Sequence, residues 1–138
     1  MKDDQDSENR RDYEAFCAEY GFSEAEVQAI TQNKADQIPM PDGFCAIRLA
    51  QSDLHGMGMF AATDVLTGGI LAPARLGVKR TPAGRYTNHA KRPNCVFIPH
   101  SNGDIFLVAA EDIPCGTELT VDYRQAGRVN GNNRPKAT

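Results

Sequence analysis

The sequence contains no apolar run that approaches the roughly 18 residues a helix needs to span a bilayer. Its first residues, MKDDQDSENRRD, are acidic and polar, whereas a signal peptide is first basic and then apolar. Internal repeats and coiled-coil heptads are also missing. We therefore expect a cytoplasmic protein that makes no contact with a membrane.

Close pairs of cysteine are missing as well. The four cysteines are far apart and form no C-x-x-C pair, so the sequence offers no zinc site built from neighbouring ligands. In a reducing cytosol such residues are most simply small apolar side chains of the core. They are Cys17, Cys45, Cys95 and Cys115. We therefore predict a protein without a bound metal.

The chain has no excess of positive charge: 15 Lys and Arg stand against 18 Asp and Glu, a formal net charge of -3. Binding to nucleic acid requires a basic face that neutralises phosphates, so we predict no nucleic-acid partner. The same sign of charge mildly favours a lysine-rich peptide as a partner.

At 138 residues the chain is long enough for one domain with short appendages, but too short for two. Pro39 and Pro41 mark a linker near its first third. We divide the chain into a polar segment with a helical hairpin (residues 1–41), a β-rich domain (42–124) and a tail (125–138). The tail is rich in Gly, Asn and Arg and is predicted to be flexible.

Two helices are predicted before the linker, after a disordered segment at residues 1–9. In the first, apolar side chains recur at i, i+3, i+4 and i+7, which is one face of an amphipathic helix that Gly21 would cap. The second begins at a capping box of Ser23 and Glu26 and runs to about residue 35. The apolar face of the first helix consists of Tyr13, Phe16, Cys17 and Tyr20.

The helical hairpin, residues 10–37, has two interpretations. Its apolar face has to be buried, so the simpler one is a lid over a hydrophobic surface of the domain. The other is an arm that docks a substrate or joins two copies in a homodimer. The sequence leaves both open.

Beyond Asp42 the sequence changes to short β-prone runs separated by Gly, Pro and Asn, which is typical of a mainly β fold. Asn102 and Gly103 predict a tight hairpin turn, because both residue types tolerate the positive φ that such a turn requires. The predicted strands cover residues 44–49, 57–62, 69–71, 95–98, 105–110 and 118–121.

Gly56 and Gly58 flank Met57 directly before a predicted strand, so another group can approach the backbone there with no Cβ in the way. Two glycines around one residue also mark a bulge or a tight turn, and the sequence alone leaves both interpretations open. The pattern is not a dinucleotide-binding fingerprint, because the third glycine and the crossover helix are missing.

Three segments taken together resemble one family. They are HGMGMFA at 55–61, RYTNHAKRPNC at 85–95 and GTELTVDY at 116–123. Their order, with a predicted hairpin between the last two, is similar to the SET domain, the fold of most protein lysine methyltransferases. The resemblance covers about residues 44–124. It implies the SET β-clip fold of small, mostly antiparallel sheets with a C-terminal pseudoknot, in which the segment near Tyr123 threads under the 85–95 loop.

The resemblance also implies S-adenosyl-L-methionine as the cofactor and a lysine-containing protein or peptide as the substrate. The residues that would bind the cofactor are Gly56, Met57, Gly58, Asn88, His89 and Tyr123. Tyr123 would lie beside the transferred methyl group and is the predicted catalytic residue. Methyl transfer to an amine depends mostly on alignment and on oxygen dipoles around the methyl, so few reactive side chains are needed.

A substrate lysine must arrive neutral although its usual pKa is about 10.4, and a narrow apolar channel lowers this pKa by desolvation. Apolar walls therefore matter more than a general base. The predicted channel residues are Tyr86, Phe97, Phe106 and Val121. Each of the three aromatic residues is equally a candidate for the ordinary core.

The chain departs from the family pattern in two places. Lys91 stands where many members have a zinc-binding cysteine and no cysteine follows Tyr123, so another segment must close the lysine channel. Only about fifteen residues separate Gly69 from Arg85, where typical members insert a longer wall of the peptide groove. That groove must be shallower or be completed by the helical hairpin.

Arg85 and Asn94 are expected to serve as hydrogen-bonding struts of the 85–95 loop.

Three functions are compatible with these residues. The leading one is a minimal protein lysine methyltransferase of the kind seen in bacteria and viruses. The second, from another class, is a SET-like module without turnover that binds a peptide or serves in assembly. The third is a β-rich domain whose motifs match by chance.

Overall fold

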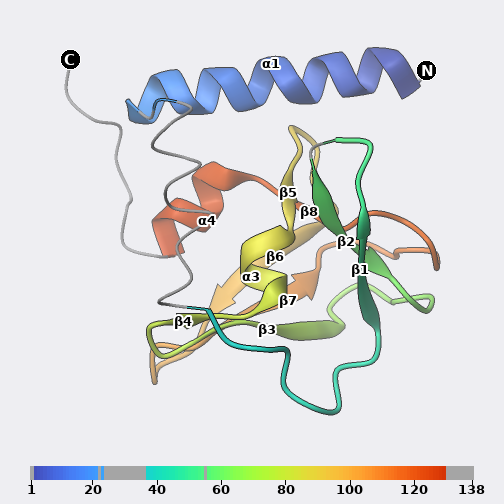
Figure 1. Cartoon of the computed structure of the whole chain (residues 1–138), viewed down its shortest axis with the longest axis vertical. Coiled ribbons are helices and arrows are strands. Elements are labelled where there is room, and N and C mark those ends of the chain that lie inside the picture. Colours follow the sequence, from blue (N-terminus) through green and yellow to red (C-terminus); the bar gives the residue numbers. More distant parts are fainter. Residues whose placement is uncertain (1, 22, 24–36, 55, 130–138) are drawn as a thin grey trace.

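A computed structural model describes residues 2–21, 23, 37–54 and 56–129 of the chain. Figure 1 shows a long helix, α1 (Lys2–Tyr20), lying along one side of a body made of short strands and short helices. Within the described residues the strands form three small sheets. The prediction of a mainly β domain built from small sheets is confirmed.

Antiparallel pairing dominates these sheets. One consists of β1 (Ile47–Gln51) and β2 (Met57–Ala61). The largest has the strand order β4 (Lys79–Arg80), β3 (Ile70–Leu76), β7 (Ile105–Ala109) and β6 (Cys95–Pro99). The third pairs β5 (Asn88–His89) with β8 (Thr120–Val121), and these two strands run parallel. Parallel strands need a long connection, and here the β6–β7 hairpin lies within it.

The hairpin between β6 and β7 turns where the sequence predicts it. Gly103 has a φ of +93°, and the backbone N–H of His100 donates to the carbonyl of Asp104 over 2.8 Å. The side chain of Asn102 accepts from the backbone N–H of Asp104 over 3.0 Å. The turn sets the register in which Cys95 pairs with Ala109.

Strand β3 is longer than the predicted run at 69–71. Pro73 lies inside it, and proline has no N–H to give to a neighbouring strand. The strand accommodates this with two register shifts against β7, one between Ile70 and Ala72 and one between Pro73 and Arg75. The proline therefore lies at a bulge inside the strand, beyond residue 71 where the predicted run ended.

A short helix, α3 (Pro82–Tyr86), was not predicted and lies directly before β5. Thr81 is its N-cap, and its hydroxyl accepts from the backbone N–H groups of Ala83 and Gly84 over 3.1 and 3.4 Å. Pro82 occupies the first turn, where its missing N–H costs nothing. A threonine followed by proline was thus a helix-start signal that the sequence contained.

The predicted disorder is wrong for residues 2–9, because α1 begins at Lys2. Its first half is held by tertiary contacts. Asn9 is buried and its side chain accepts from the backbone N–H of Lys91 over 3.1 Å, while Glu8 lies 3.5 Å from the guanidinium of Arg92. At its other end α1 stops at Gly21, whose φ of +70° fits the predicted cap.

The predicted flexible tail is wrong for residues 125–129, which continue α4 (Tyr123–Val129). Gln125 anchors this helix on β6, because its side-chain amide donates to the carbonyl of Phe97 over 2.7 Å and accepts from the N–H of Phe97 over 3.1 Å. Residues 130–138 and the second predicted helix, apart from Ser23, lie outside the described residues.

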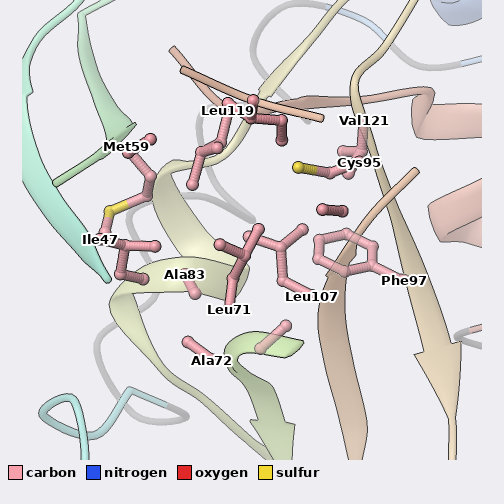
Figure 2. Packing of buried hydrophobic residues seen from close by; sticks show 14 of the residues in the cluster. Ile47, Met59, Leu71, Ala72, Ala83, Cys95, Phe97, Leu107, Leu119 and Val121 are labelled. Carbon is pink, nitrogen blue, oxygen red and sulfur yellow. The ribbon is translucent and has the colours of Figure 1, made fainter. Parts of the chain in front are cut away.

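The core is shared by all three sheets and by α3, so it holds them together as one unit (Figure 2). Leu107 and Leu119 are fully buried in it, and so is Cys95, as expected for a small apolar side chain. The same prediction is wrong for Cys45 and Cys115, which are exposed, and Cys17 is only partly buried. Burial raises the pKa of the Cys95 thiol to about 12, which keeps it protonated and unreactive. The cluster comprises Ile47, Met59, Ala61, Leu71, Ala72, Ala74, Ala83, Cys95, Phe97, Ile105, Leu107, Ala109, Ile113, Leu119 and Val121.

Gly84→Ala should destabilise the fold. A Cβ at this position would collide with the backbone carbonyl oxygen of Ala74 and lie 3.0 Å from its carbonyl carbon. Strand β3 holds that carbonyl in place, so relief requires α3 to shift away from the sheet. We expect the free energy of unfolding to fall by about 1 to 3 kcal/mol, the usual cost of overpacking. Urea denaturation measures the change, and a wild-type midpoint would show that α3 moves freely.

Candidate active site around Tyr123

The parallel pair β5–β8 brings two of the sequence motifs side by side. Asn88 pairs with Thr120 and His89 with Val121. Asn94 supports this pairing as the predicted strut, since its side chain donates to the carbonyl of Glu118 over 2.9 Å and accepts from the N–H of Thr120 over 2.9 Å. The threading of the C-terminal segment under this loop remains a prediction.

The other predicted strut, Arg85, contacts the linker. Its guanidinium donates to the side chain of Gln37 over 2.8 Å and lies 4.7 Å from the ring centre of Tyr86. It therefore ties the linker before the β-rich domain to α3, and its role as a strut of the loop stays a prediction.

Tyr123 follows β8 directly and is fixed at both ends. Its backbone N–H donates to Nδ1 of His89 over 3.0 Å, and its hydroxyl donates to the carbonyl of Thr87 over 3.3 Å. Burial, together with the negative charge of Glu118, raises the pKa of the phenol well above its usual value. The hydroxyl therefore stays protonated at neutral pH and acts as a fixed dipole.

The glycine turn, which contains Gly56 and Gly58, lies next to the side chain of Asn88. The side-chain amide of Asn88 donates to the carbonyl of Met57 over 3.2 Å and to the carboxylate of Glu118 over 2.8 Å. The hydroxyl of Ser52 donates to the same carboxylate over 2.8 Å. A Cβ at position 58 would collide with that carboxylate and lie 3.1 Å from the amide nitrogen of Asn88, so a larger residue would push the Glu118 carboxylate out of its present position.

Both sequence interpretations of the glycine pair describe part of this turn. Gly56 has a φ of +50°, and its carbonyl accepts from the N–H of Ser52 over 2.8 Å, which is a tight turn between β1 and β2. Gly58 provides the close approach to Asn88 and Glu118. The turn thus lies beside a polar cradle formed by the Met57 carbonyl and the side chains of Asn88 and Glu118.

The chemistry of this cradle suits the amino-acid end of S-adenosylmethionine. The Met57 carbonyl and the Glu118 carboxylate are acceptors for an ammonium group, and the Asn88 amide both donates and accepts. The missing Cβ at Gly58 lets a ligand approach the backbone. The residues present therefore fit the cofactor that the sequence motifs imply.

The four predicted channel residues do not gather at one point. Phe97 pairs with Leu107 and Ile98 with Phe106, so Phe97 and Phe106 lie on opposite faces of the same sheet. Phe106 packs on His100, with ring centres 4.6 Å apart. Val121 is fully buried, and Tyr86 packs against the core. A small cavity of about 40 Å³ is lined by Ala74, Arg75, Arg80, Gly84, Phe97 and Ile105.

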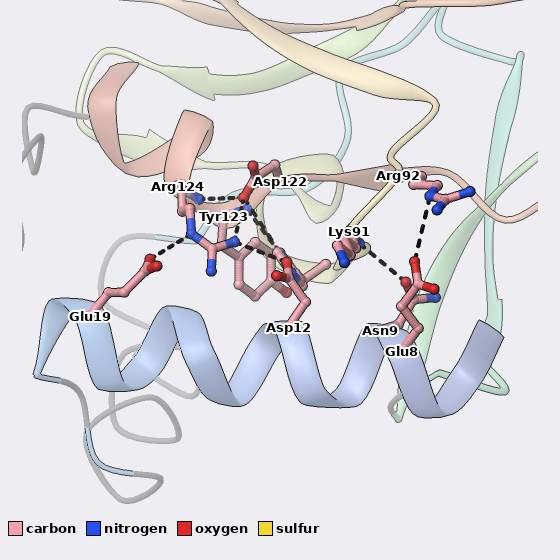
Figure 3. Close-up of polar contacts among 10 residues, drawn as sticks. Glu8, Asn9, Asp12, Glu19, Lys91, Arg92, Asp122, Tyr123 and Arg124 are labelled. Carbon is pink, nitrogen blue, oxygen red and sulfur yellow. Dashed lines mark hydrogen bonds and ion pairs between the residues drawn. The ribbon is translucent and has the colours of Figure 1, made fainter. Parts of the chain in front are cut away.

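Helix α1 contributes residues that the sequence did not assign to the site. Asp12 accepts from the guanidinium of Arg124 over 2.9 Å (Figure 3). It also accepts from Nε2 of His89 over 2.8 Å. Burial opposes ionisation of Asp12, but the hydrogen bonds from Arg124 and His89 outweigh it and hold the pKa of the carboxyl below its usual value. Glu19 accepts from the same arginine over 2.6 Å.

Aromatic side chains of α1 cover the same place. The ring centres of Tyr13 and Phe16 lie 6.0 and 5.6 Å from that of Tyr123, both edge-on. Each also lies 6.2 Å from the ring of His89. The first helix of the predicted hairpin is therefore a cover over the candidate site, as its apolar stripe suggested.

Neither a metal cluster nor a membrane-spanning helix occurs in the part of the chain that the structure describes. There, no three His, Cys, Asp or Glu side chains are grouped so that they would hold a metal ion. No helix among these residues has the length and hydrophobicity to cross a bilayer. The predicted absence of zinc remains a prediction.

Two solved structures are similar to the chain at low sequence identity. A humanised mutant of the Polycomb Repressive Complex 2 of Chaetomium thermophilum, bound to the inhibitor GSK126, is 22% identical with a TM-score of 0.51, covering 66% of this chain and 15% of that chain. A candidate histone methyltransferase of Plasmodium falciparum is 20% identical with a TM-score of 0.48, covering 56% of this chain and 92% of that chain.

The comparison of sequences adds the family. None of the curated proteins compared with the chain matches it. The sequence model of the SET domain, however, matches residues 4–124, which include most of α1, the glycine turn, the Asn88-His89 strand and Tyr123. On this match, which spans most of its length, the chain belongs to the SET domain family.

Proposed function

We propose that the protein transfers a methyl group from S-adenosylmethionine to the side-chain amine of a lysine in a protein or peptide. The observation that carries this proposal is the fixed position of Tyr123. Its hydroxyl donates to the Thr87 carbonyl and its N–H to His89, and it follows the strand that pairs with the strand of Asn88. If these residues served only the structure, the fold would not need the buried, neutral phenol of Tyr123 beside β8 and the Asn88 cradle on the paired strand β5.

Each part of the site has a role in this reaction. The Gly58 turn and Asn88 would hold the amino-acid end of the cofactor, which when bound supplies a methyl group on a positively charged sulfonium. Tyr123 would align the amine with that methyl, and its hydroxyl and the Thr87 carbonyl place oxygen dipoles beside the charge that moves during transfer. The aromatic cover from Tyr13 and Phe16 excludes water from the phenol.

A binding module without turnover is the competing function. One observation favours it: the segment between Gly69 and Arg85, which forms a wall of the peptide groove in typical relatives, is filled here by β3, β4 and α3 alone. A peptide would then be held by fewer walls. Retention of the complete Tyr123 arrangement favours the enzyme.

Calorimetry with S-adenosylmethionine, followed by a methylation assay, tests the proposal. We expect saturable binding of one cofactor per chain and transfer of labelled methyl to lysine in a panel of lysine-rich proteins and peptides. Cofactor binding without transfer to any member of the panel would favour the binding module. Absence of cofactor binding would reject both SET-type functions.

Methylation should become faster with rising pH. Below the pKa of the substrate lysine, the neutral fraction grows about tenfold per pH unit, and kcat/KM should follow it between about pH 6 and 9. Ionisation of Tyr123 should not interfere, because burial raises the pKa of its phenol. The folded-state pKa of Asp12 is lowered, so its stabilising contacts are present above the ordinary value of 3.8 and are lost only in acid. A flat profile would contradict a lysine amine as the acceptor.

A further inference from the structure

Asp12 lies where α1 meets the candidate site. Its carboxylate oxygen Oδ2 accepts from Nε2 of His89 over 2.8 Å and from Arg124 over 2.9 Å. The side chains of His89 and Asp12 are only 2% and 16% accessible. A carboxylate and an imidazole in contact at this depth restrict each other to one geometry.

The hydrogen bonds of His89 fix its tautomer. The backbone N–H of Tyr123 donates to Nδ1 over 3.0 Å, so Nδ1 must carry a lone pair and no proton. The proton of the neutral ring is therefore on Nε2, which points at Asp12. The hydrogen bond that one ring nitrogen makes determines whether the other nitrogen carries a proton. By accepting from Nε2, Asp12 therefore favours the tautomer in which Nδ1 accepts from the N–H of Tyr123.

The surroundings of His89 strengthen this arrangement. Phe16 stacks on the ring with an interplanar angle of 22°, and Tyr13 covers it at 53°. Asp122 is the other nearby carboxylate, with its oxygen 3.9 Å from Nδ1, too long for a hydrogen bond, and it accepts from the N–H of Arg124 over 2.9 Å. The imidazole thus has Asp12 on one side and the backbone of Tyr123 on the other.

We propose that Asp12 is a positioning residue of the methyltransferase site, which acts on Tyr123 through His89. The inference rests on the function proposed above and extends it to a helix outside the three sequence motifs. Without the carboxylate, His89 is free to take the other tautomer, in which Nδ1 carries a proton and repels the N–H of Tyr123. The phenol of Tyr123 would then lose its fixed position against Thr87.

Glu19 provides a matched control. Both acidic side chains lie on α1 and both accept from Arg124, over 2.9 Å for Asp12 and 2.6 Å for Glu19, but only Asp12 contacts His89. Asp12→Ala should lower kcat about tenfold to a hundredfold, as small misplacements of reacting groups do, with little change in the Kd of S-adenosylmethionine. Glu19→Ala should leave kcat within about twofold. Asp12→Asn should recover part of kcat, because its amide oxygen also accepts from Nε2.

Nuclear magnetic resonance tests the same inference without any turnover. In the wild type, ring ¹⁵N shifts of His89 should report the tautomer with the proton on Nε2. In Asp12→Ala the two tautomers should mix and the amide of Tyr123 should exchange faster with solvent, whereas Glu19→Ala should leave both unchanged. Asp12→Asn, which keeps the shape and the acceptor, shows whether an effect of the alanine variant reflects only a loosened α1.

The outcomes separate this inference from the proposed function. A proton on Nδ1 in the wild type would overturn the inference, and so would Asp12→Ala with wild-type kcat and Tyr123 exchange. A rise of kcat in Asp12→Ala would overturn it too, because α1 would then obstruct the site. A wild type that methylates nothing would reject the proposed function, while the tautomer and exchange data would still decide whether Asp12 holds Tyr123.

Discussion

Tyr123→Phe is expected to lower kcat for lysine methylation roughly a hundredfold while leaving the Kd of S-adenosylmethionine almost unchanged. The substitution removes only the hydroxyl, which donates to the Thr87 carbonyl. The ring would keep its packing against His89 at 5.1 Å and Phe16 at 5.6 Å between ring centres. The substitution should therefore weaken alignment and charge stabilisation in the transition state. Steady-state kinetics measure this loss of kcat, and calorimetry measures cofactor binding separately.

The fold should tolerate this substitution. The lost hydrogen bond is 3.3 Å long, so the free energy of unfolding should fall by less than about 1 kcal/mol. Tyr20→Phe is a suitable control, because it removes a hydroxyl from the same aromatic cluster, through a ring 5.0 Å from Phe16, while Tyr123 keeps its own hydroxyl. It should keep kcat within about twofold. Full activity of Tyr123→Phe would remove this residue from the proposed mechanism.

Asn88→Ala should weaken cofactor binding by about 1 to 3 kcal/mol, or roughly fivefold to 150-fold in Kd. The amide of Asn88 joins the Met57 carbonyl to the Glu118 carboxylate, and both acceptors are left short of a donor when it is removed. The carboxylate would then move toward water and leave the cradle. Titration calorimetry measures the change.

Asn102→Ala is the control for Asn88→Ala, since it changes an exposed asparagine in the β6–β7 turn, remote in sequence from both the glycine turn and Tyr123. It should leave the Kd unchanged. An unaltered Kd in Asn88→Ala would place the cofactor elsewhere on the molecule.

The sequence predicted the parts of this site whose signals are local. The motif around Asn88 and the motif that ends at Tyr123 were recognisable as strings, and the Asn102-Gly103 turn between them depends on backbone preferences of two residues. Strands β6 and β7 follow from β-prone runs on either side of that turn.

The parts that it missed depend on how distant segments pack. Strand β5 has only two residues, too few for any periodicity, and exists because β8 pairs with it. Asp12 is one of several acidic residues of α1, and only docking selects it as the partner of His89. The positions of Phe97 and Phe106 on opposite faces follow from the register of β6 and β7, which the sequence alone did not supply.

The hydrogen bonds at His89 also bear on how the chain folds. The ring is bonded to Tyr123, 34 positions later in the chain, and to Asp12, 77 positions earlier. Contacts between such distant positions form late, because each must first overcome the entropy of closing a long loop. During synthesis, α1 would therefore bond to His89 only after β5 has been made. Both would reach their final contacts only after β8, the strand before Tyr123, has been made. Most of the domain would thus be synthesised before the contacts around Tyr123 can form.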